Sequence, residues 1–281
     1  MRNENEEKLR ELVKKWTNHF YWRKDFLKWQ ERRIKQENHQ DKVIENLKQL
    51  FPNLKRAKIL DLGCGMGGFL VAMKRLGYEI IGLDPNPEYL EIAKLRAKRY
   101  SFNLELIQGY GENLPFSDKS FDLVYCAEVL EHCQNPEKVL GEIYRVLKDD
   151  GAVYLTVANR FAFFDSHYQW YFLNWLPRFL GELVIKLKNI QKEDSLSGFQ
   201  KLSHMHYFTF KSFQKLAEQK GFKIEDVRKR KLENSESISN KTFKKLATFL
   251  NKLKLSKIFY SIYQNYFLTN FILILNKNKQ K

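Results

Sequence analysis

The feature that most constrains the fold is a glycine-rich turn between an apolar run and a helical pattern. Residues 57–63 read AKILDLG, a short buried strand, and residues 67–77 read GGFLVAMKRLG, a helix that ends at Gly77. Between them, Gly63, Gly65 and Gly68 satisfy the spacing G-x-G-x-x-G. Glycines allow close backbone approach, and the N–H groups at a helix start are unpaired. The sequence therefore predicts a strand, a ligand-binding turn and a helix.

The same alternation of strand and helix continues up to Asn159. Apolar runs predict further strands at 78–84, 104–109, 121–126 and 152–159. Helical spacing predicts helices at 87–100 and 136–151, the second ending at Gly151. Short apolar strands that alternate with helices indicate an α/β fold, a parallel sheet with helices on both faces.

The segments on either side of this region have a different character. Residues 4–50 repeat apolar side chains at helical spacing and predict an N-terminal helical extension. Residues 161–179 contain nine aromatic side chains. Beyond them we predict a helix at 209–221, a strand at 223–232, a lysine-rich amphipathic helix at 241–253 and a last strand at 270–278.

Composition narrows the class of protein. A chain of 281 residues with 43% hydrophobic and 15% aromatic residues is not globally disordered. Three cysteines without a paired spacing, and a charged start without an apolar stretch, predict a reduced cytoplasmic protein. The net charge of +16 leaves nucleic acid, an anionic membrane, an acidic ligand or no binding role as alternatives.

Two aspartates indicate what the turn binds. Asp84 ends the next strand 21 residues after Gly63, where it can accept hydrogen bonds from ribose hydroxyls. That alone permits an NAD enzyme. Asp61, two residues before Gly63, disfavours a pyrophosphate and suits a cationic amino-acid ligand.

Five ordered motifs give the chain a resemblance to a known family. They are ILDLGCGMGGF, EIIGLDPN, GYGENLPFSDKSFDLV, AEVLEH and LKDDGAVYL. Together they resemble the S-adenosylmethionine-binding core of class I methyltransferases of the type-11 kind, which includes quinone-biosynthesis enzymes. The resemblance covers about 100 residues, from Ile59 to Asn159. It implies a Rossmann-like, seven-stranded, mostly parallel sheet with S-adenosyl-L-methionine as cofactor.

The resemblance also implies four parts of the chain. They are a helical extension (1–53), a cofactor-binding core (54–159), an aromatic helical substrate cap inserted after the fifth strand (160–200), and a C-terminal part of the core (201–281). It assigns the methionine end of the cofactor to Asp61, Gly63, Cys64, Gly65, Ala127 and Glu128. It assigns the nucleoside to Asp84, Pro85, Asn86, Gly111 and Glu112. The chain departs from the family at Tyr110, where relatives usually have an aspartate that often bonds the adenine amine.

Histidines are the candidates for a general base. An oxygen or nitrogen nucleophile needs a base of near-neutral pKa for methyl transfer. We select His132, which follows the fourth strand, and the pair His204 and His206; His167 is a further candidate. The alternatives are a histidine packed under the cofactor and a hydrogen-bonded or solvated pair. The pair faces one side if its segment is extended.

A metal is not expected. Glu128, Glu131 and His132 form an E-x-x-E-H cluster that resembles a divalent-metal site in some quinone O-methyltransferases. The same letters occur in relatives without a metal, as residues that start a helix. Cys126 and Cys133 lack the spacing of zinc ligands.

The main hypothesis is in-line methyl transfer to a small-molecule, glycan or lipid-linked acceptor, with oxygen as the favoured atom. The alternatives are an RNA or protein methyltransferase, and a non-catalytic protein of the same fold. The lysine-rich helix at 241–257 can lie on an anionic membrane, whereas the aromatics are not interleaved with basic residues as nucleic-acid binding requires. The uncharged run 258–275 is interpreted as a helix and a strand, not a membrane span. The sequence leaves the oligomeric state open.

Overall fold

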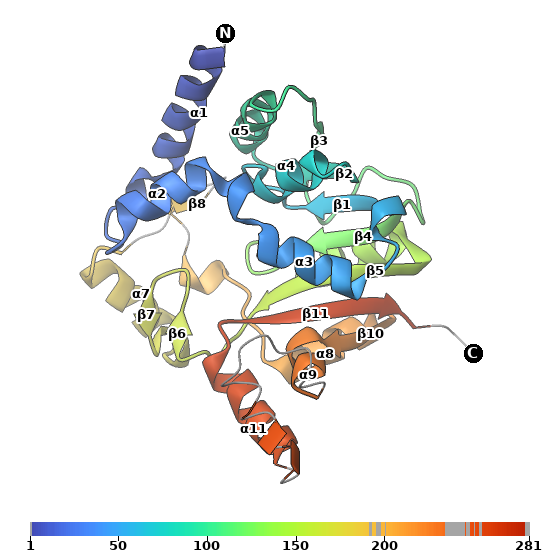
Figure 1. The fold of residues 1–281 in the computed structure, drawn as a ribbon. Helices are drawn as coiled ribbons and strands as arrows, with labels where there is room; N and C mark the ends of the chain where they lie inside the picture. Colours follow the sequence, from blue (N-terminus) through green and yellow to red (C-terminus); the bar gives the residue numbers. More distant parts are fainter. Residues whose placement is uncertain are drawn as a thin grey trace.

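A seven-stranded sheet forms the centre of the molecule (Figure 1). The computed structural model describes residues 2–190, 193–194, 198–199, 201–233, 245, 248–249, 251–252 and 255–278. The strand order is β10-β11-β5-β4-β1-β2-β3. The bounds are β1 Lys58–Leu62, β2 Glu79–Asp84, β3 Glu105–Gln108, β4 Phe121–Cys126, β5 Leu147–Ala158, β10 Phe222–Asp226 and β11 Asn270–Lys277. Only β11 runs antiparallel to its neighbours, so the predicted mostly parallel, Rossmann-like sheet is confirmed.

Helices cover both faces of the sheet because strand side chains alternate between them. Leu60 and Leu62 of β1 pack on one face with α6 and α8, and Ile59 packs on the other with α3 and α4. These helices span α3 Asp41–Leu50, α4 Gly68–Arg75, α5 Pro87–Lys98, α6 Pro136–Val146 and α8 Phe210–Gln219. The sheet is thereby buried on both sides.

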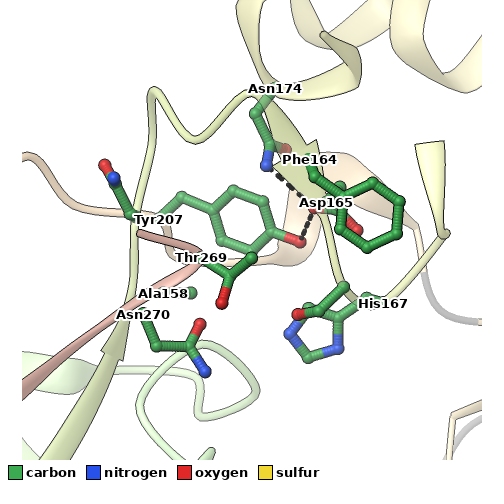
Figure 2. A pocket seen from close by; sticks show the side chains of 10 residues that line it. Ala158, Phe164, Asp165, His167, Asn174, Tyr207, Thr269 and Asn270 are labelled. Carbon is green, nitrogen blue, oxygen red and sulfur yellow. Dashed lines mark hydrogen bonds between the residues drawn. The ribbon is translucent and has the colours of Figure 1, made fainter. Parts of the chain in front are cut away.

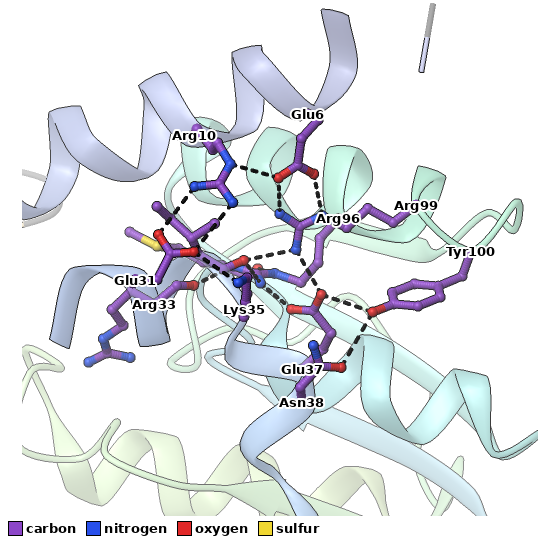
Figure 3. Close-up of polar contacts among 12 residues, drawn as sticks. Glu6, Arg10, Glu31, Arg33, Lys35, Glu37, Asn38, Arg96, Arg99 and Tyr100 are labelled. Carbon is purple, nitrogen blue, oxygen red and sulfur yellow. Dashed lines mark hydrogen bonds and ion pairs between the residues drawn. The ribbon is translucent and has the colours of Figure 1, made fainter. Parts of the chain in front are cut away.

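The N-terminal extension docks on α5 through apolar packing and buried charge. It contains α1 (Arg2–Thr17), α2 (Phe26–Ile34), two short 3₁₀ turns (Asn18–Phe20 and Gln36–His39) and α3. Glu37, buried in the second turn, pairs with the fully buried Arg96 of α5 and with Arg99 (Figure 3). Arg96 also donates from Nε to the carbonyl of Met66 in the glycine turn, 3.0 Å away. The extension therefore holds the turn from behind.

The insertion after β5 is mixed in structure. It has a hairpin of β6 (Phe164–Asp165) and β7 (Trp170–Tyr171), a 3₁₀ turn (Leu173–Trp175) and α7 (Arg178–Leu187). A second pair, β8 (Glu193–Asp194) and β9 (Gly198–Phe199), follows. Figure 1 shows this cap at the end of the sheet to which the arrow of β1 points. Tyr168, Leu173 and Ile185 give it a small apolar core of its own.

Two element boundaries differ from the prediction. The helix expected to end at Gly151 ends at Val146, and β5 begins at once. The register between β4 and β5 shifts there, and a Cβ on Gly151 would lie 3.0 Å from the carbonyl oxygen of Asp122. Gly151 is thus a point of close strand approach, not a helix end.

The strand expected over 223–232 is also shorter, because β10 ends at Asp226 and α9 (Val227–Glu233) follows. Asp226 Oδ1 accepts from the backbone N–H groups of Arg228 and Lys229, as an N-cap does.

The C-terminal part completes the sheet. A 3₁₀ turn (Leu202–His204) precedes α8, and α11 (Ser256–Ile262) continues into a π-helical turn (Tyr263–Phe267) before β11. The last strand is therefore confirmed. Most of the lysine-rich helix predicted at 241–253 lies outside the described residues. Within the described ranges, no helix has the length and apolar character that a membrane crossing requires.

Candidate active site

The glycine turn is shaped by left-handed backbone and close packing. Gly63 and Gly65 have φ of 71° and 53°, in the left-handed region that residues other than glycine rarely adopt. The N–H groups of Gly63 and Cys64 both donate to the carbonyl of Leu83 at the end of β2, at 2.8 and 3.0 Å. A Cβ on Gly63 would lie 2.4 Å from Cγ2 of Val129, whereas one on Gly65 would meet open space. The turn thus presents bare backbone beside Gly65.

Asp84 ties this turn to the next strand end. Its Oδ2 accepts from the N–H of Gly65 at 2.8 Å, and its Oδ1 accepts from the N–H of Asn86 at 2.9 Å. Asn86 in turn caps α5, since its Oδ1 accepts from the N–H of Glu88. The carbonyl of Pro85 accepts from Gln108 Nε2 at 3.2 Å. Burial raises the pKa of the Asp84 carboxyl above its ordinary value.

Asp61 is a buried acid with an unpartnered side-chain oxygen. It is 2% exposed, and its Oδ2 has no hydrogen-bond partner among the described residues. Burial, and then the charge of Asp84, raise the pKa of the Asp61 carboxyl well above its ordinary value. An unpartnered buried carboxylate oxygen is costly, and a cationic ligand would relieve the cost. The residues therefore fit the amino-acid end of S-adenosylmethionine.

The loop of residues 109–112, which the resemblance assigns to the nucleoside, is anchored from the side. Glu112 Oε1 accepts from the N–H groups of Gln134 and Asn135 at the start of α6, at 2.8 and 3.2 Å. Tyr110 is 53% exposed. A Cβ on Gly111 would lie 3.3 Å from Val139, so the backbone here is packed closely.

The loop after β4 carries backbone strain. Glu128 adopts φ of 57°, and its N–H donates to Thr156 Oγ1 of β5 at 2.8 Å. Left-handed backbone at an acidic side chain costs free energy and is often retained at functional sites. Ala127 precedes it at the end of β4, and the next residue, Val129, packs on Gly63. The loop therefore reaches the glycine turn.

His132 lies in a group with a buried acid and a cap residue. Glu131 is 1% exposed, and its Oε1 is 3.6 Å from Nε2 of His167. The rings of His132 and His167 are 5.4 Å apart and nearly perpendicular. Burial alone would raise the pKa of the Glu131 carboxyl, but His167 and His132 outweigh it and lower that pKa.

The same three side chains could hold a metal ion, since one ligand atom from each lies within 4.8 Å of the others. Glu128, the remaining residue of the sequence cluster, is not part of this group. The expectation that no metal is needed stays a prediction.

The second pair of candidate histidines is split. His204 ends a 3₁₀ turn and is exposed, so the extended segment that would align it with His206 is not formed. The N–H of His206 donates to the carbonyl of Glu131 at 3.0 Å. The structure therefore brings the backbone of His206 beside the His132 loop and leaves His204 at the surface.

Residues that the sequence did not single out join this group from the cap and from the segment after it (Figure 2). Asp165 is 3% exposed, and its Oδ2 accepts from Asn174 Nδ2 at 2.8 Å and from the Tyr207 hydroxyl at 2.7 Å. The ring of Tyr207 lies 6.2 Å from that of His167. The gap that they line is too narrow for a water molecule. Tyr207 directly follows His206 in sequence and could have been considered, whereas nothing marks Asp165 among its aromatic neighbours.

Comparison with known proteins relates the chain to methyltransferases. Residues 60–155 match a family described as a methyltransferase domain. A ubiquinone biosynthesis O-methyltransferase of Pelagibacter ubique is 30% identical over 167 residues, which are 55% of this chain and 67% of that protein. One of Aliivibrio fischeri is 34% identical over 119 residues, 42% of this chain and 49% of that protein. The chain thus spans about half the length of most curated relatives that it matches.

Two solved structures share the fold. An S-adenosylmethionine-dependent methyltransferase from Mesorhizobium loti is 16% identical with a TM-score of 0.52, and the match covers 82% of this chain and 95% of that one. A phosphoethanolamine N-methyltransferase of Haemonchus contortus is 18% identical with a TM-score of 0.51, covering 85% of this chain and 53% of that one. At these identities the likeness concerns the fold.

Proposed function

This chain belongs to the S-adenosylmethionine-dependent methyltransferase family, and we propose that it transfers a methyl group to a small-molecule, glycan or lipid-linked acceptor. The observation that carries the proposal is the bare glycine turn flanked by two buried aspartates. Asp61 keeps an unpartnered oxygen, and Asp84 holds the turn at Gly65. A fold alone does not require this arrangement.

The proposed roles follow from where the residues lie. When bound, S-adenosylmethionine supplies an activated methyl group on a sulfonium whose leaving group is neutral. The Asp61 carboxylate would face the cationic amino-acid end, and Asp84 would offer its remaining lone pairs to the ribose. The cap would then orient the acceptor and exclude water, effects worth up to about 7–11 kcal/mol in favourable cases.

An oxygen acceptor is favoured, and it needs a group to take its proton. Relatives named as ubiquinone biosynthesis O-methyltransferases support oxygen as the accepting atom. His132 is the proposed base because its ring neighbours His167, which is paired with the buried Glu131. The backbone of His206 is bonded to the carbonyl of Glu131, and its side chain is the second candidate, while His204 would have to turn inward from the surface.

Isothermal titration with S-adenosylmethionine tests the cofactor site. We expect the wild-type protein to bind, and Asp84→Ala to lose most of its affinity because both the turn and the ribose contact depend on this carboxylate. Asp118→Ala is the matched control, since Asp118 is exposed and pairs with Arg145. Folded wild-type protein that shows no binding at millimolar ligand would overturn the proposal.

A transfer assay tests the chemistry. Labelled methyl groups would be followed into phenolic, glycan and lipid-linked acceptors, with His132→Ala and a chelator as separate arms. We expect His132→Ala to lower turnover without changing cofactor affinity, and the chelator to have no effect. Loss of activity with the chelator, restored by a divalent metal, would show instead that Glu131, His132 and His167 bind a metal.

A peripheral contact with an anionic membrane is a further part of the proposal. Exposed apolar side chains lie on the segments 172–187 and 258–267, and they include Phe172, Phe179, Leu187, Ile258, Ile262 and Phe267. Aromatic contacts join the two segments, with Phe163 5.0 Å from Phe267 and Trp175 5.7 Å from Tyr266. The net charge of +16 would complement anionic lipid.

Sedimentation with vesicles tests this contact. Phosphatidylglycerol vesicles should bind the protein more tightly than phosphatidylcholine vesicles, and Phe179→Ser with Leu187→Ser should weaken binding. Single-stranded RNA over a salt series is the competing arm. RNA binding with a steep salt dependence and no vesicle binding would favour a nucleic-acid substrate instead.

A further inference from the structure

Two half-buried arginines at the base of the cap lack the partners that the buried Arg96 has. Arg160 follows β5, and Arg178 opens α7. In each, Nη1 is buried and has no hydrogen-bond partner within the described part of the chain. Arg160 retains one long bond from Nη2 to the carbonyl of Leu176, at 3.4 Å. By contrast, Arg96 places all three of its guanidinium nitrogens on acceptors.

The acids nearest to Arg178 are already occupied. Asp165 accepts from Asn174 and Tyr207, and Glu182 accepts from the N–H of Ser203 at 3.0 Å. Among the described residues, neither acid forms an ion pair with Arg178. A guanidinium presents five N–H donors in a fixed fork, so unpaired donors that are shielded from water are costly.

The two guanidinium groups lie near the start of α7. Arg178 stacks on the ring of Tyr207, with 4.8 Å between the guanidinium carbon and the ring centre. Arg160 Nη2 donates to the carbonyl of Leu176, two residues before Arg178. Burial, and then the charge of Arg178, lower the pKa of Arg160. Pro177 at the start of α7 provides no side-chain cap for the free N–H groups of that helix. An anion between these donors would relieve each of these costs.

The position links the arginines to the proposed reaction centre. The ring of Tyr207 that carries Arg178 is 6.2 Å from that of His167, which is 5.4 Å from that of His132. Ring contacts therefore connect Arg178 to His132 by way of Tyr207 and His167.

We propose that Arg160 and Arg178 bind an anionic oxygen group, a phosphate or carboxylate, on the methyl acceptor. That the anion belongs to a methyl acceptor rests on the proposed function, whereas the anion site itself does not. Arg178 would supply a two-pronged contact to the oxyanion, and Arg160 would add a second positive charge beside it. The acceptor would thus be held by its anionic end, with its nucleophile directed to His132.

Binding of inorganic phosphate and of phenyl phosphate, measured by calorimetry at saturating S-adenosylhomocysteine, tests the site. We expect wild-type protein to bind both, and Arg178→Gln and Arg160→Gln each to weaken binding by at least about tenfold. Arg230→Gln is the matched control, because Arg230 is exposed on α9 and pairs with Glu225. Arg178→Lys keeps the charge but loses the fork, so it should bind more weakly than wild type and more tightly than Arg178→Gln.

The outcomes separate this proposal from the proposed function. S-adenosylhomocysteine affinity should be equal in all of these proteins, and equal affinity shows that the variants fold. If wild-type protein does not bind S-adenosylhomocysteine, the proposed function fails, while phosphate binding can still be measured. Phosphate binding that is absent from wild type, or equal in all variants, would overturn the anion site. Phosphatidylglycerol vesicles form a second arm. Loss of vesicle binding in Arg178→Gln, beside loss of phenyl phosphate binding, would identify a lipid headgroup, and unchanged vesicle binding would identify a free anionic acceptor.

Discussion

The protein buries charge in two contrasting ways on the two sides of the glycine turn. Behind the turn, Glu37 and Arg96 are both buried and meet directly, and Arg96 also bonds the carbonyl of Met66 within the turn (Figure 3). In front of the turn, Asp61 is equally buried but leaves Oδ2 without a partner in the described structure. The first arrangement is complete without a ligand and the second is not.

The difference distinguishes support from function. A buried ion pair with full hydrogen bonding holds elements in place, whereas an unpartnered buried oxygen costs free energy that the fold itself does not recover. The complete network restrains Met66, and the turn it restrains carries the bare backbone of Gly65. The rigid side therefore keeps the unsatisfied side open for a cofactor.

Breaking the complete network should have the largest effect on stability. Glu37→Gln leaves the charge of Arg96 buried without its counter-ion, and we expect the free energy of unfolding to fall by about 3–5 kcal/mol. Urea denaturation measures this loss. Glu91→Gln is the control, because the pair of Lys8 and Glu91 is exposed and should contribute little. Equal effects of the two substitutions would contradict the role given to Glu37.

The glycine turn offers a comparison within one motif. Gly63→Ala combines a clash at 2.4 Å with Val129 and a φ of 71°, so we expect a loss of roughly 2–4 kcal/mol in the free energy of unfolding. Gly65→Ala meets no neighbour and should lose only about 1–2 kcal/mol, from its backbone conformation. Its methyl group would point into the open space where the cofactor is proposed to bind.

Thermal or urea unfolding with and without S-adenosylmethionine separates the two variants. Gly65→Ala should fold and yet lose most of its stabilisation by the cofactor. If Gly65→Ala kept wild-type cofactor affinity, the cofactor would not approach this backbone.

The sequence predicted the order of strands and helices in the sheet better than the residues at which single elements end. The alternation of strands and helices, the turn at Gly63 and the last strand all follow from local patterns that the sheet then uses. The end of α6 does not follow from a local pattern. Gly151 resembles a helix-ending glycine in the sequence, but its close approach to Asp122 depends on the register of β4 and β5. Asp226 ended a strand early for a similar reason, as it caps α9.

The candidate site divides in the same way. The glycine turn and Asp84 belong to neighbouring sequence motifs, and a hydrogen bond joins them directly in the structure. The neighbours of His132 are not, since His167 and Tyr207 come from the cap and from the segment after it. Long-range contacts of this kind depend on how the insertion folds back, which no local pattern records.

Removing the charge from Asp61 should make the ligand-free protein more stable and the cofactor site weaker. We expect Asp61→Asn to raise the free energy of unfolding by about 1–2 kcal/mol, because a buried carboxylate with an unpartnered oxygen is replaced by a neutral amide. Calorimetry should show at least about tenfold weaker S-adenosylmethionine binding. A variant that is both less stable and fully able to bind would show that Asp61 is a structural residue.

The smallest predicted effect is in the pH dependence of the free energy of unfolding. Asp61 and Glu37 should change it in opposite directions. The pKa of Asp61 is raised in the folded protein, so above its unfolded value of about 3.9 the folded state binds more protons than the unfolded state. Wild-type stability should therefore fall relative to Asp61→Asn as the pH rises above about 4, by at most about 1.4 kcal/mol per pH unit. Urea denaturation from about pH 4 to 7 measures the difference.

Glu37 should behave in the opposite way. Burial alone would raise the pKa of its carboxyl, but the charges of Arg96 and Arg99 outweigh it, and the pKa lies below its ordinary value. Its contribution is then complete above about pH 4.3 and is lost as the pH falls toward the folded pKa. The stability advantage of wild type over Glu37→Gln should thus be constant from pH 5 to 7 and should shrink only below about pH 4.3. The stability disadvantage of wild type against Asp61→Asn should instead develop as the pH rises above about 4. The same sign for both differences would mean that Asp61 has a partner that balances its charge, and the contrast between the two sides of the turn would not hold.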